Sequence, residues 1–325
     1  MSKEAMKLIG LPYILLIVSF VVGCTPGRGP TGPSDPVPCV SVESINKGNY
    51  LENIAAAERE KFKTMGFDQF EAKVYHESFA GGKYIVNGDT PIIDQDQLRI
   101  FYRNQILNTS SASMTQGLVV HQVNNQDAKW DDTSKKQLTY CVSTTFGGNY
   151  QQVVNNMQSA TGAWEIAADV QFEHLSAQDN NCTANNPNVV FDVRPVDVNG
   201  QYLARAFFPG DGRAARNILI DDSSFNSLPG NLTLTGIIRH ELGHTLGFRH
   251  EHTRPDSGAC FEDNNWRPLT NYDPWSVMHY PQCNGNGDWS LTLTALDKMG
   301  AACLYGTIGG GTAQDCGISQ PPACP

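Results

Sequence analysis

Residues 240–252 read HELGHTLGFRHEH, and this stretch decides how the rest of the sequence is interpreted. The chain has 325 residues and eight histidines, half of which fall within these positions. The surrounding stretch LTLTGIIRHELGHTLGF (232–248) contains no proline and repeats its apolar residues at helical spacing. It predicts a helix that begins with Thr233 or Thr235 as its cap.

His240 and His244 lie one turn apart on this helix, and Glu241 lies beside them. Side chains at this spacing project from the same face, so both imidazoles can reach one metal ion. A carboxylate at position 241 can hydrogen-bond water at the metal without being a ligand. A solvated polar helix face can also carry this pattern by chance, so the two histidines alone leave both interpretations open.

His250 follows His244 by six residues, which on a straight helix would carry it away from the metal. Gly247 tolerates a positive φ, so we expect the helix to end there and the chain to turn back. Three neutral imidazoles leave a fourth position open, as in catalytic zinc sites. We therefore predict that His240, His244 and His250 bind Zn²⁺, and that Glu241 is the general base for attack by metal-activated water.

The stretch HELGHTLGFRH resembles the extended zinc motif of the metzincin metallopeptidases, HExxHxxGxxH. YDPWSVMHY (272–280) is similar to the methionine turn of that clan, which implies that Met278 lies beneath the zinc. Within the clan, residues 233–305 look most like the astacins. That resemblance implies that Tyr280 is catalytic and stabilises the oxyanion, and that Glu251 secures the mature N-terminus.

Further residues match astacin positions in the same order along the chain: Arg254, Asp256, Asp297 and Tyr305. His252 departs from the pattern because astacins usually have glutamine there, and we expect it to face solvent. Upstream, ARAFFPGDGRAARNILIDDS (204–223) is closer to the matrixins, so the chain resembles a relative between the two families, such as the bacterial HEIGH-type peptidases.

The predicted fold class is α+β. Short strands rich in β-branched and aromatic residues surround a predicted helix at 150–167, and a helix-rich end follows. The predicted strands are LTYCVS (138–143), VQFEHL (170–175), VVFDVRP (189–195), LARAFF (203–208) and NILID (217–221). The resemblance implies a metzincin fold: a twisted mixed five-stranded sheet with two helices, a zinc cleft, and a smaller irregular subdomain with the Met-turn and a C-terminal helix.

The N-terminal residues predict export. Residues 1–24 are typical of a lipoprotein signal peptide ending in Val-Val-Gly-Cys24, although an ordinary secretory signal is the alternative. Residues 25–38 are rich in Pro and Gly and predict a tether, and residues 39–128 predict a propeptide or an accessory region. Residues 129–305 would form the metallopeptidase domain, and residues 306–325 a cysteine-containing tail.

Eight cysteines besides Cys24 predict up to four disulfides, among which we expect Cys260 to pair with Cys283. The net charge of −10, without a run of Lys or Arg, argues against a nucleic-acid partner.

A latency switch is predicted in YIVNGDT (84–90), where Val86-Asn87-Gly88-Asp89 resembles the astacin propeptide motif F-x-G-D with Val in place of Phe. The resemblance implies that Asp89 occupies the open zinc position until the propeptide is removed. An ordinary Asn-Gly-Asp turn before a helix capped by Asp94 is the alternative.

The sequence thus predicts an exported zinc endopeptidase that acts on protein or peptide substrates as a monomer. It would be anchored in the outer membrane or at the cell surface through Cys24, or secreted. The alternative is a surface binding or adhesion lipoprotein on an inactive metzincin scaffold. A structural zinc protein is disfavoured because closed structural sites have four ligands and favour cysteine.

Overall fold

The computed structural model describes residues 62–107 and 118–308, except 227, 258–259, 261, 263–264, 284 and 288. The predicted signal peptide, the tether and nearly all of the tail lie outside the described residues. The apolar residues of NYLENIAAAEREKFKTMG (49–66) have helical spacing, but the helix that they predict lies outside the described residues apart from its last few positions. No helix among the described residues is long and apolar enough to cross a membrane.

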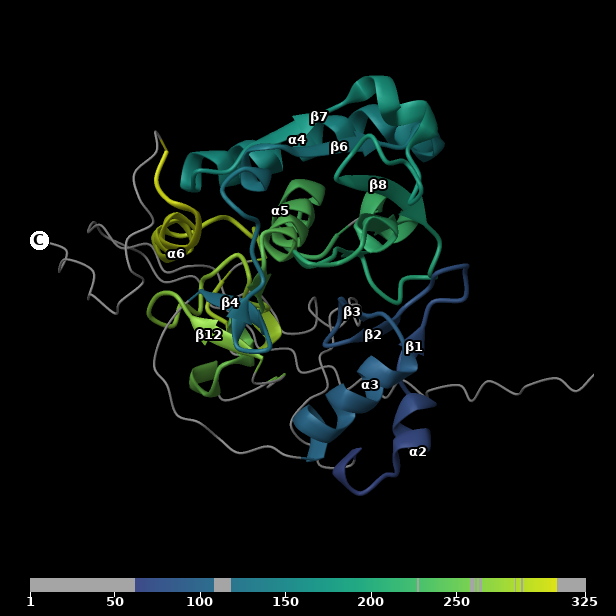
Figure 1. The fold of residues 1–325 in the computed structure, drawn as a ribbon, viewed down its shortest axis with the longest axis vertical. Helices are drawn as coiled ribbons and strands as arrows, with labels where there is room; N and C mark the ends of the chain where they lie inside the picture. The colour runs from purple at the N-terminus through teal and green to yellow at the C-terminus, as the bar shows by residue number, and fades with distance from the viewer. Residues whose placement is uncertain are drawn as a thin grey trace, which may run out of the picture. The chain divides into compact units, whose positions relative to one another are not determined.

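A five-stranded sheet with the order β7-β6-β8-β10-β9 forms the core of the metal-binding part of the chain (Figure 1). Its strands are β6 (Leu138–Val142), β7 (Phe172–His174), β8 (Phe191–Val196), β9 (Ala204–Arg205) and β10 (Asn217–Asp221). Neighbouring strands are parallel except for β9, which pairs antiparallel with β10 at one edge. The five predicted strands and the mixed sheet are therefore confirmed.

The alternation of residues along these strands separates the two faces of the sheet. One face is apolar, with residues such as Val193, Ile218 and Ala204 in the main hydrophobic core. The opposite face carries charged residues, because Arg194 on β8 and Arg205 on β9 both lie in register with Leu219 of β10.

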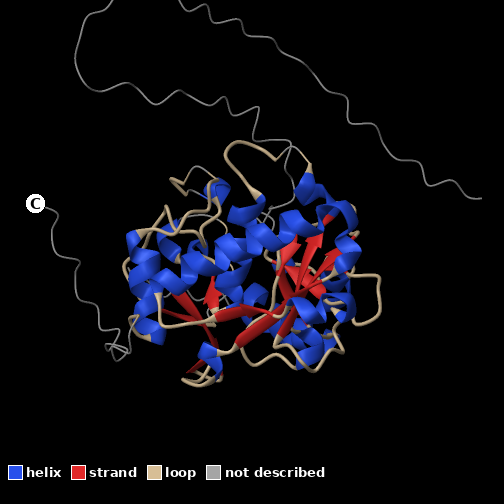
Figure 2. Cartoon of the chain, turned by 90° about the horizontal axis from the view of Figure 1, so that it is seen from above, coloured by secondary structure: helices blue, strands red, loops and turns tan. Residues whose placement is uncertain are grey.

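Two helices cover the apolar face, α4 (Tyr150–Ala167) and α5 (Leu234–Thr245), and their buried residues share one core with it. Figure 2 shows helices and strands packed together, seen from above. α4 has the bounds that the sequence predicts. It buries Val153, Met157, Ala160 and Trp164, which recur every three to four residues and so form one stripe. The indole of Trp164 donates from Nε1 to the carbonyl of Arg239 at 2.9 Å, which ties α4 to α5.

The C-terminal helix α6 (Ala295–Tyr305) begins with a capping box, in which Thr294 and Asp297 each bond the other's backbone N–H. The second carboxylate oxygen of Asp297 accepts from the hydroxyl of Ser276, and Val277 N–H also donates to Asp297. One buried aspartate therefore fixes both the start of α6 and the predicted methionine turn.

A second sheet joins distant parts of the chain. β4 (Val119–Val123) pairs with β11 (Phe248–Arg249), with β12 (Trp266–Pro268) and with β5 (Gln126–Asp127). The stretch GLVVHQV (117–123) predicts a strand from its β-branched residues, and β4 confirms it. β4 borders the residues that follow α5.

The N-terminal segment, residues 62–107, has a small sheet and a small core of its own (Figure 1). Its antiparallel strands are β1 (Tyr75–His76), β2 (Tyr84–Val86) and β3 (Thr90–Ile92). Its helices are α2 (Phe67–Glu71) and α3 (Gln95–Phe101), the latter continuing as a π-helical turn (Tyr102–Leu107). Asp94 caps α3 as predicted, since its side chain accepts from Gln97 N–H at 2.8 Å.

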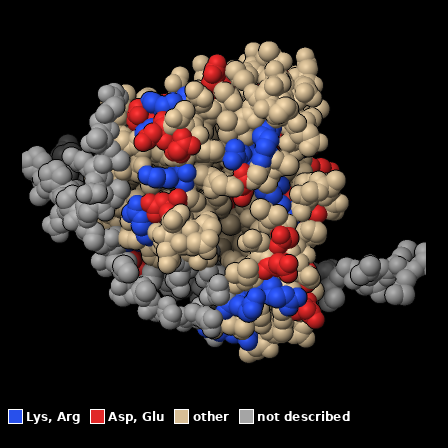
Figure 3. Space-filling model, in the orientation of Figure 1, with Lys and Arg blue, Asp and Glu red and all other residues tan. Residues whose placement is uncertain are grey.

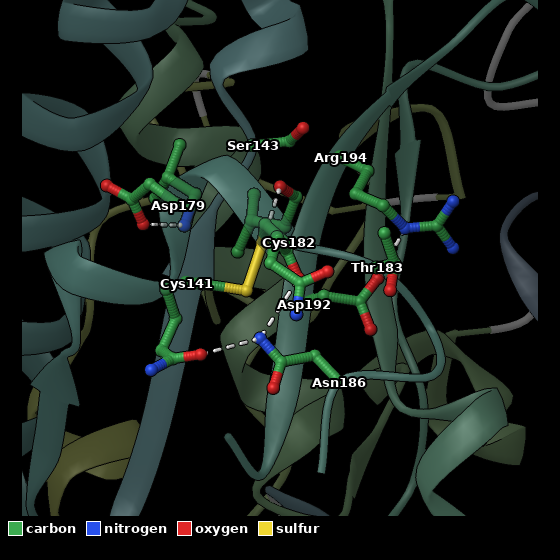
Figure 4. The surroundings of a disulfide bond; sticks show 12 residues. Cys141, Ser143, Asp179, Cys182, Thr183, Asn186, Asp192 and Arg194 are labelled. Atoms are coloured by element: carbon green, nitrogen blue, oxygen red, sulfur yellow. Dashed lines mark hydrogen bonds and ion pairs between the residues drawn. A yellow bond between two sulfur atoms is a disulfide. The ribbon is translucent and has the colours of Figure 1, made fainter. Parts of the chain in front are cut away.

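Two disulfides lie among the described residues. The predicted pair Cys260–Cys283 is confirmed. The pair Cys141–Cys182, which the sequence does not single out, joins β6 to the loop after β7 beside Asp179 and Asn186 (Figure 4). On the face shown in Figure 3, acidic and basic side chains are interspersed, in agreement with the absence of a basic stripe in the sequence.

Candidate metal centre

The helix α5 presents two histidines on one buried face. It begins at Thr233, whose hydroxyl accepts from Gly236 N–H at 3.0 Å, so the first of the two predicted caps is the one used. His240 and His244 follow one turn apart, and both are buried. This places their imidazole rings 5.0 Å apart between centroids.

The helix ends at Gly247, as predicted. Its φ is +92°, a conformation that L side chains rarely adopt. A Cβ at this position would also lie 2.0 Å from the carbonyl oxygen of Ala128. The chain turns back here, and β11 returns His250 to the two helical histidines.

The three Nε2 atoms converge on one point. His250 Nε2 lies 3.2 Å from Nε2 of His244 and 3.2 Å from Nε2 of His240. Zn–N bonds of about 2.0–2.1 Å in a tetrahedron place two ligand nitrogens about 3.4 Å apart, close to these separations.

The other ring nitrogens show which atoms hold protons. His240 Nδ1 lies 2.7 Å from the carbonyl oxygen of Val277, and His244 Nδ1 lies 2.8 Å from that of Phe248. A carbonyl only accepts, so both Nδ1 atoms carry the proton and both Nε2 atoms carry a lone pair. His250 Nδ1 contacts the carboxylate of Glu262 in the same way. Nε2 atoms facing one another at this distance need a proton or a metal ion between them, and three neutral imidazoles form a donor set that fits zinc.

Asp89 of the N-terminal segment lies at the same point, which agrees with the predicted latency switch. Its Oδ1 is 3.1 Å from Nε2 of His250 and 3.7 Å from Nε2 of His244, and its Oδ2 is 3.4 Å from Nε2 of His240. The carboxylate is buried, and Oδ1 has no hydrogen-bond partner. A buried carboxylate that approaches all three imidazoles, with one oxygen lacking a hydrogen-bond partner, is placed as a fourth metal ligand would be.

The charges of the site also call for a cation. Burial lowers the pKa of His250, but the carboxylates of Asp89 and Glu262 on either side of its ring outweigh burial and raise it to about 10. Burial raises the pKa of Asp89, but the charge of His250 and contacts with all three histidines hold it well below its usual range. A bound zinc ion would take the place of that imidazolium charge.

Glu241 lies beside the centre without facing into the histidine triangle. It is buried, and its Oε2 has no hydrogen-bond partner. Burial and the nearby Asp89 carboxylate raise its pKa well above the usual range. It lines a pocket whose walls are otherwise largely apolar: Leu203, Ala204, Leu232, Ile237, Trp289 and Leu291.

Tyr280 reaches the centre from the methionine turn. Its hydroxyl donates to Asp89 Oδ2, and its ring centroid is 4.5 Å from that of His250. The predicted catalytic tyrosine therefore lies beside the predicted ligands, with its hydroxyl occupied by the N-terminal segment.

Met278 packs beneath the zinc helix. A Cβ at Gly243 would lie 2.4 Å from the sulfur of Met278, so the glycine inside the HELGH stretch is required by this contact. The carbonyl of Met278 accepts from Glu251 N–H at 2.8 Å, which joins the methionine turn to the residue after the third histidine.

Glu262 is a site residue that the sequence analysis missed. Its Oε1 contacts His250 Nδ1 and lies 3.2 Å from His252 Nε2, and its Oε2 accepts from Arg249 at 3.0 Å. The position of Cys260 gives the one signal in the sequence, since its predicted bond to Cys283 brings this loop close to Tyr280.

The expectation that His252 faces solvent is wrong. The residue is fully buried, and its Nδ1 accepts from Tyr280 N–H at 3.2 Å while its Nε2 faces Glu262. Burial lowers its pKa to about 3, so the ring is neutral at ordinary pH. It links the loop of Glu262 to the methionine turn.

The remaining residues that match astacin positions are buried or partly buried around the centre. Glu251 accepts from Asp273 N–H at 2.9 Å through Oε1, whereas its Oε2 has no hydrogen-bond partner. Arg254 Nη1 lies 3.5 Å from Glu251 Oε1, and Arg254 Nε lies 3.7 Å from Asp256 Oδ2. Tyr305 donates from its hydroxyl to the carbonyl of Leu246 at 2.7 Å, at the end of the zinc helix.

Comparison with known proteins agrees with this geometry. The matrixin family model (Peptidase_M10) matches residues 129–257. Residues 129–257 belong to the metzincin zinc metallopeptidases. The metzincin domain, as it is called below, has zinc as its cofactor, and its five-stranded mixed sheet with two helices is the predicted metzincin fold.

Individual relatives come from both families that the sequence resembles, the astacins and the matrixins. Zinc metalloproteinase nas-30 of Caenorhabditis elegans is 34% identical over 94 residues, which is 23% of this chain and 12% of that protein. The astacin-like metalloendopeptidase of Coturnix japonica is 42% identical over 71 residues, which is 16% of this chain and 17% of that protein.

Matrix metalloproteinase-A of Caenorhabditis elegans is 25% identical over 168 residues, which is 47% of this chain and 30% of that protein. The chain therefore spans less than a third of the length of each of these relatives.

Proposed function

We propose that this chain is a zinc endopeptidase of protein or peptide substrates, made as a precursor in which Asp89 closes the metal centre. The observation that carries the proposal is the convergence of three Nε2 atoms beside the unpaired carboxylate oxygen of Glu241. A structural zinc site would have no use for an unpaired carboxylate at its edge.

When bound, zinc supplies Lewis acidity, which acidifies water and polarises the scissile carbonyl. Glu241 takes the proton of the attacking water and passes it to the leaving amine. The unpaired, buried Oε2 of Glu241 is free to accept and release this proton. Tyr280 donates its hydroxyl to the oxyanion, from the position where it now donates to Asp89.

Latency follows from the same contacts. Asp89 occupies the place of the catalytic water and engages the hydroxyl of Tyr280, so substrate cannot enter until residues 62–107 leave. Asn87 and Gly88 both have positive φ, at 54° and 91°, and form the tight turn that directs Asp89 inward.

We place the end of the removable part before residue 118. β4 pairs with β11 and β12, and Gly247 packs against Ala128, so residues 118–128 support the turn that positions His250. The propeptide of this proposal thus ends between the segment 62–107 and β4.

Export with a lipid anchor at Cys24 is a further part of the proposal. It rests on the N-terminal sequence, and the disulfides Cys141–Cys182 and Cys260–Cys283 agree with an oxidising compartment. N-terminal mass spectrometry of the native protein would report lipidation and propeptide removal together. If the N-terminal residue of the precursor is unlipidated and is not Cys24, the lipid anchor is excluded.

The test is Glu241→Ala in the activated protein, compared with wild type for zinc content and casein hydrolysis. We expect zinc to be retained and hydrolysis to fall by about 10²–10⁴-fold, the usual contribution of a general base. Hydrolysis by the variant at the wild-type rate would exclude Glu241 as the base. A zinc-loaded, processed wild type without any hydrolysis would instead favour the inactive binding lipoprotein.

A further inference from the structure

A second buried contact, away from the metal, joins the N-terminal segment to the metzincin domain. Glu77, which follows β1, forms a bidentate pair with Arg205 of β9, with Nε–Oε1 at 2.6 Å and Nη2–Oε2 at 2.9 Å. The hydroxyl of Tyr202 donates to the same carboxylate. Arg205 and Glu77 are each only 1% exposed, so the pair is shielded from solvent.

The arginine is held in place by the domain itself. Its Nη1 donates to the side-chain carbonyl of Asn217 on β10 at 2.8 Å. Arg205 therefore stays oriented when Glu77 leaves, whereas the carboxylate that it binds belongs to the removable segment. Burial raises the pKa of Glu77, but Arg205 and Tyr202 outweigh burial and keep the carboxylate ionised.

Removal of residues 62–107 uncovers this place. The side chains above it come from that segment: Tyr75, Phe79 and Ile85 pack against Tyr202, and Lys83 bonds the carbonyl of Ala215. Without them, a preoriented arginine and a tyrosine hydroxyl lie open at the edge of the sheet. A bidentate arginine with a hydroxyl donor is a binding site for a carboxylate.

The place lies beside the path of a substrate. β9 is the edge strand of the five-stranded sheet, and an extended peptide can add to such an edge by backbone hydrogen bonds. Ala204 of β9 lines the pocket of Glu241, whereas Arg205, its neighbour, faces the opposite side. A peptide extended along β9 would direct alternate side chains toward Glu241 and toward Arg205.

We propose that Arg205 and Tyr202 form a subsite that selects an acidic side chain of the substrate, and that Glu77 fills this subsite in the precursor. The inference rests on the proposed function, because it requires removal of the N-terminal segment from an active peptidase. It identifies substrates with an aspartate or glutamate near the scissile bond as the preferred class.

The experiment starts from the full chain, loaded with zinc and then activated by proteolysis, so that the domain folds with its segment in place. Internally quenched peptides carry glutamate or glutamine at each position around the scissile bond in turn. At one position we expect glutamate to raise kcat/KM by about tenfold or more, as for hydrogen bonds to a charged group.

Arg205→Gln should bring the ratio of kcat/KM between the glutamate and glutamine peptides close to one. Arg205→Lys keeps the charge but loses the bidentate geometry, so it should retain part of the preference for glutamate. It replaces Arg205→Gln in the test if the glutamine variant does not fold. The matched control is Arg194→Gln on the same face of the sheet, where Arg194 pairs with Asp192 (Figure 4). The control should keep the full preference.

A second arm does not depend on catalysis. A synthetic peptide of residues 75–90 is titrated onto the activated, zinc-loaded protein, either with Glu77 or with the substitution Glu77→Gln. We expect the substituted peptide to bind about tenfold more weakly to wild type, and the two peptides to bind Arg205→Gln equally.

Equal binding of the two peptides to wild type overturns the carboxylate site. If the two peptides bind wild type differently but no substrate position prefers glutamate, the substrate role is overturned. Arg205 and Tyr202 would then serve only to bind Glu77 of the N-terminal segment. If no peptide is hydrolysed although Glu77 still matters for binding, the proposed peptidase function fails and the carboxylate site stands. Full activity with the segment still attached also overturns the proposal, since Glu77 would then keep the subsite closed.

Discussion

Each predicted zinc ligand is fixed by a different acceptor at its Nδ1 atom. His240 uses a carbonyl of the methionine turn, His244 the carbonyl of Phe248, and His250 the carboxylate of Glu262. Such partners orient the ring and make Nε2 the free nitrogen. The spacing of the histidines predicted which residues meet, but the partners come from loops whose course only the folded chain reveals.

At Tyr280 we predict an effect on the transition state alone. In the activated protein Tyr280→Phe should lower kcat by about 10²–10³-fold with little change in KM, because the hydroxyl binds the oxyanion. The control is Tyr272→Phe, whose hydroxyl bonds His279 and does not contact the histidine ligands. Steady-state kinetics separate the two roles: a raised KM with unchanged kcat would assign Tyr280 to substrate binding.

At Glu262 we predict an effect on metal affinity. Glu262→Gln removes the negative charge that holds the His250 ring, and loss of such a partner typically weakens metal binding by about 10–100-fold. Competition with a chelator measures the Kd for zinc. Glu173→Gln, an exposed acid on β7, is the control. If the Kd for zinc is unchanged in Glu262→Gln, the negative charge of this carboxylate does not contribute to metal binding.

Among the elements, the long helices and the strands of the main sheet were predictable from the sequence, whereas several short elements elsewhere were not. α4 and α5 follow from the spacing of apolar residues, the five strands of the main sheet from their β-branched and aromatic residues, and α6 from the resemblance to the astacins. β11 and β12 are too short to carry a pattern and form because the distant strand β4 pairs with them, and β1 is a two-residue strand paired with the neighbouring β2. The unpredicted helix α2 has only five residues.

The turn after α5 gives the prediction at this scale. Gly247→Ala forces a side chain into φ +92° and toward the Ala128 carbonyl, which should destabilise the fold by about 1–3 kcal/mol or more. Because the turn delivers His250, zinc affinity should fall as well. Gly162→Ala on α4 is the control, since a Cβ there meets nothing within 4 Å.

Urea unfolding and zinc titration measure both effects of the Gly247 variant. The control should be neutral or slightly more stable, because alanine favours a helix over glycine. A Gly247→Ala protein with wild-type stability and wild-type zinc affinity would show that the turn does not depend on glycine.

At the scale of the whole molecule, two separate buried contacts join the N-terminal segment to the metzincin domain: Asp89 at the metal centre and Glu77 at Arg205. The sequence predicted the first from a short motif with a substituted first residue. The second could not be predicted, because Glu77 and Arg205 are 128 residues apart and neither lies in a recognisable pattern.

The most direct test of the account compares the peptidase activity of the unprocessed protein of residues 39–325 with that of its Asp89→Ala variant, at equal zinc content. Wild type should be nearly inactive, because the Asp89 carboxylate fills the fourth position and engages Tyr280. Asp89→Ala should be active without any cleavage of the chain, and the exposed control Asp96→Ala should stay as inactive as wild type. Full activity of the unprocessed wild type would contradict the account and make residues 39–128 an accessory region.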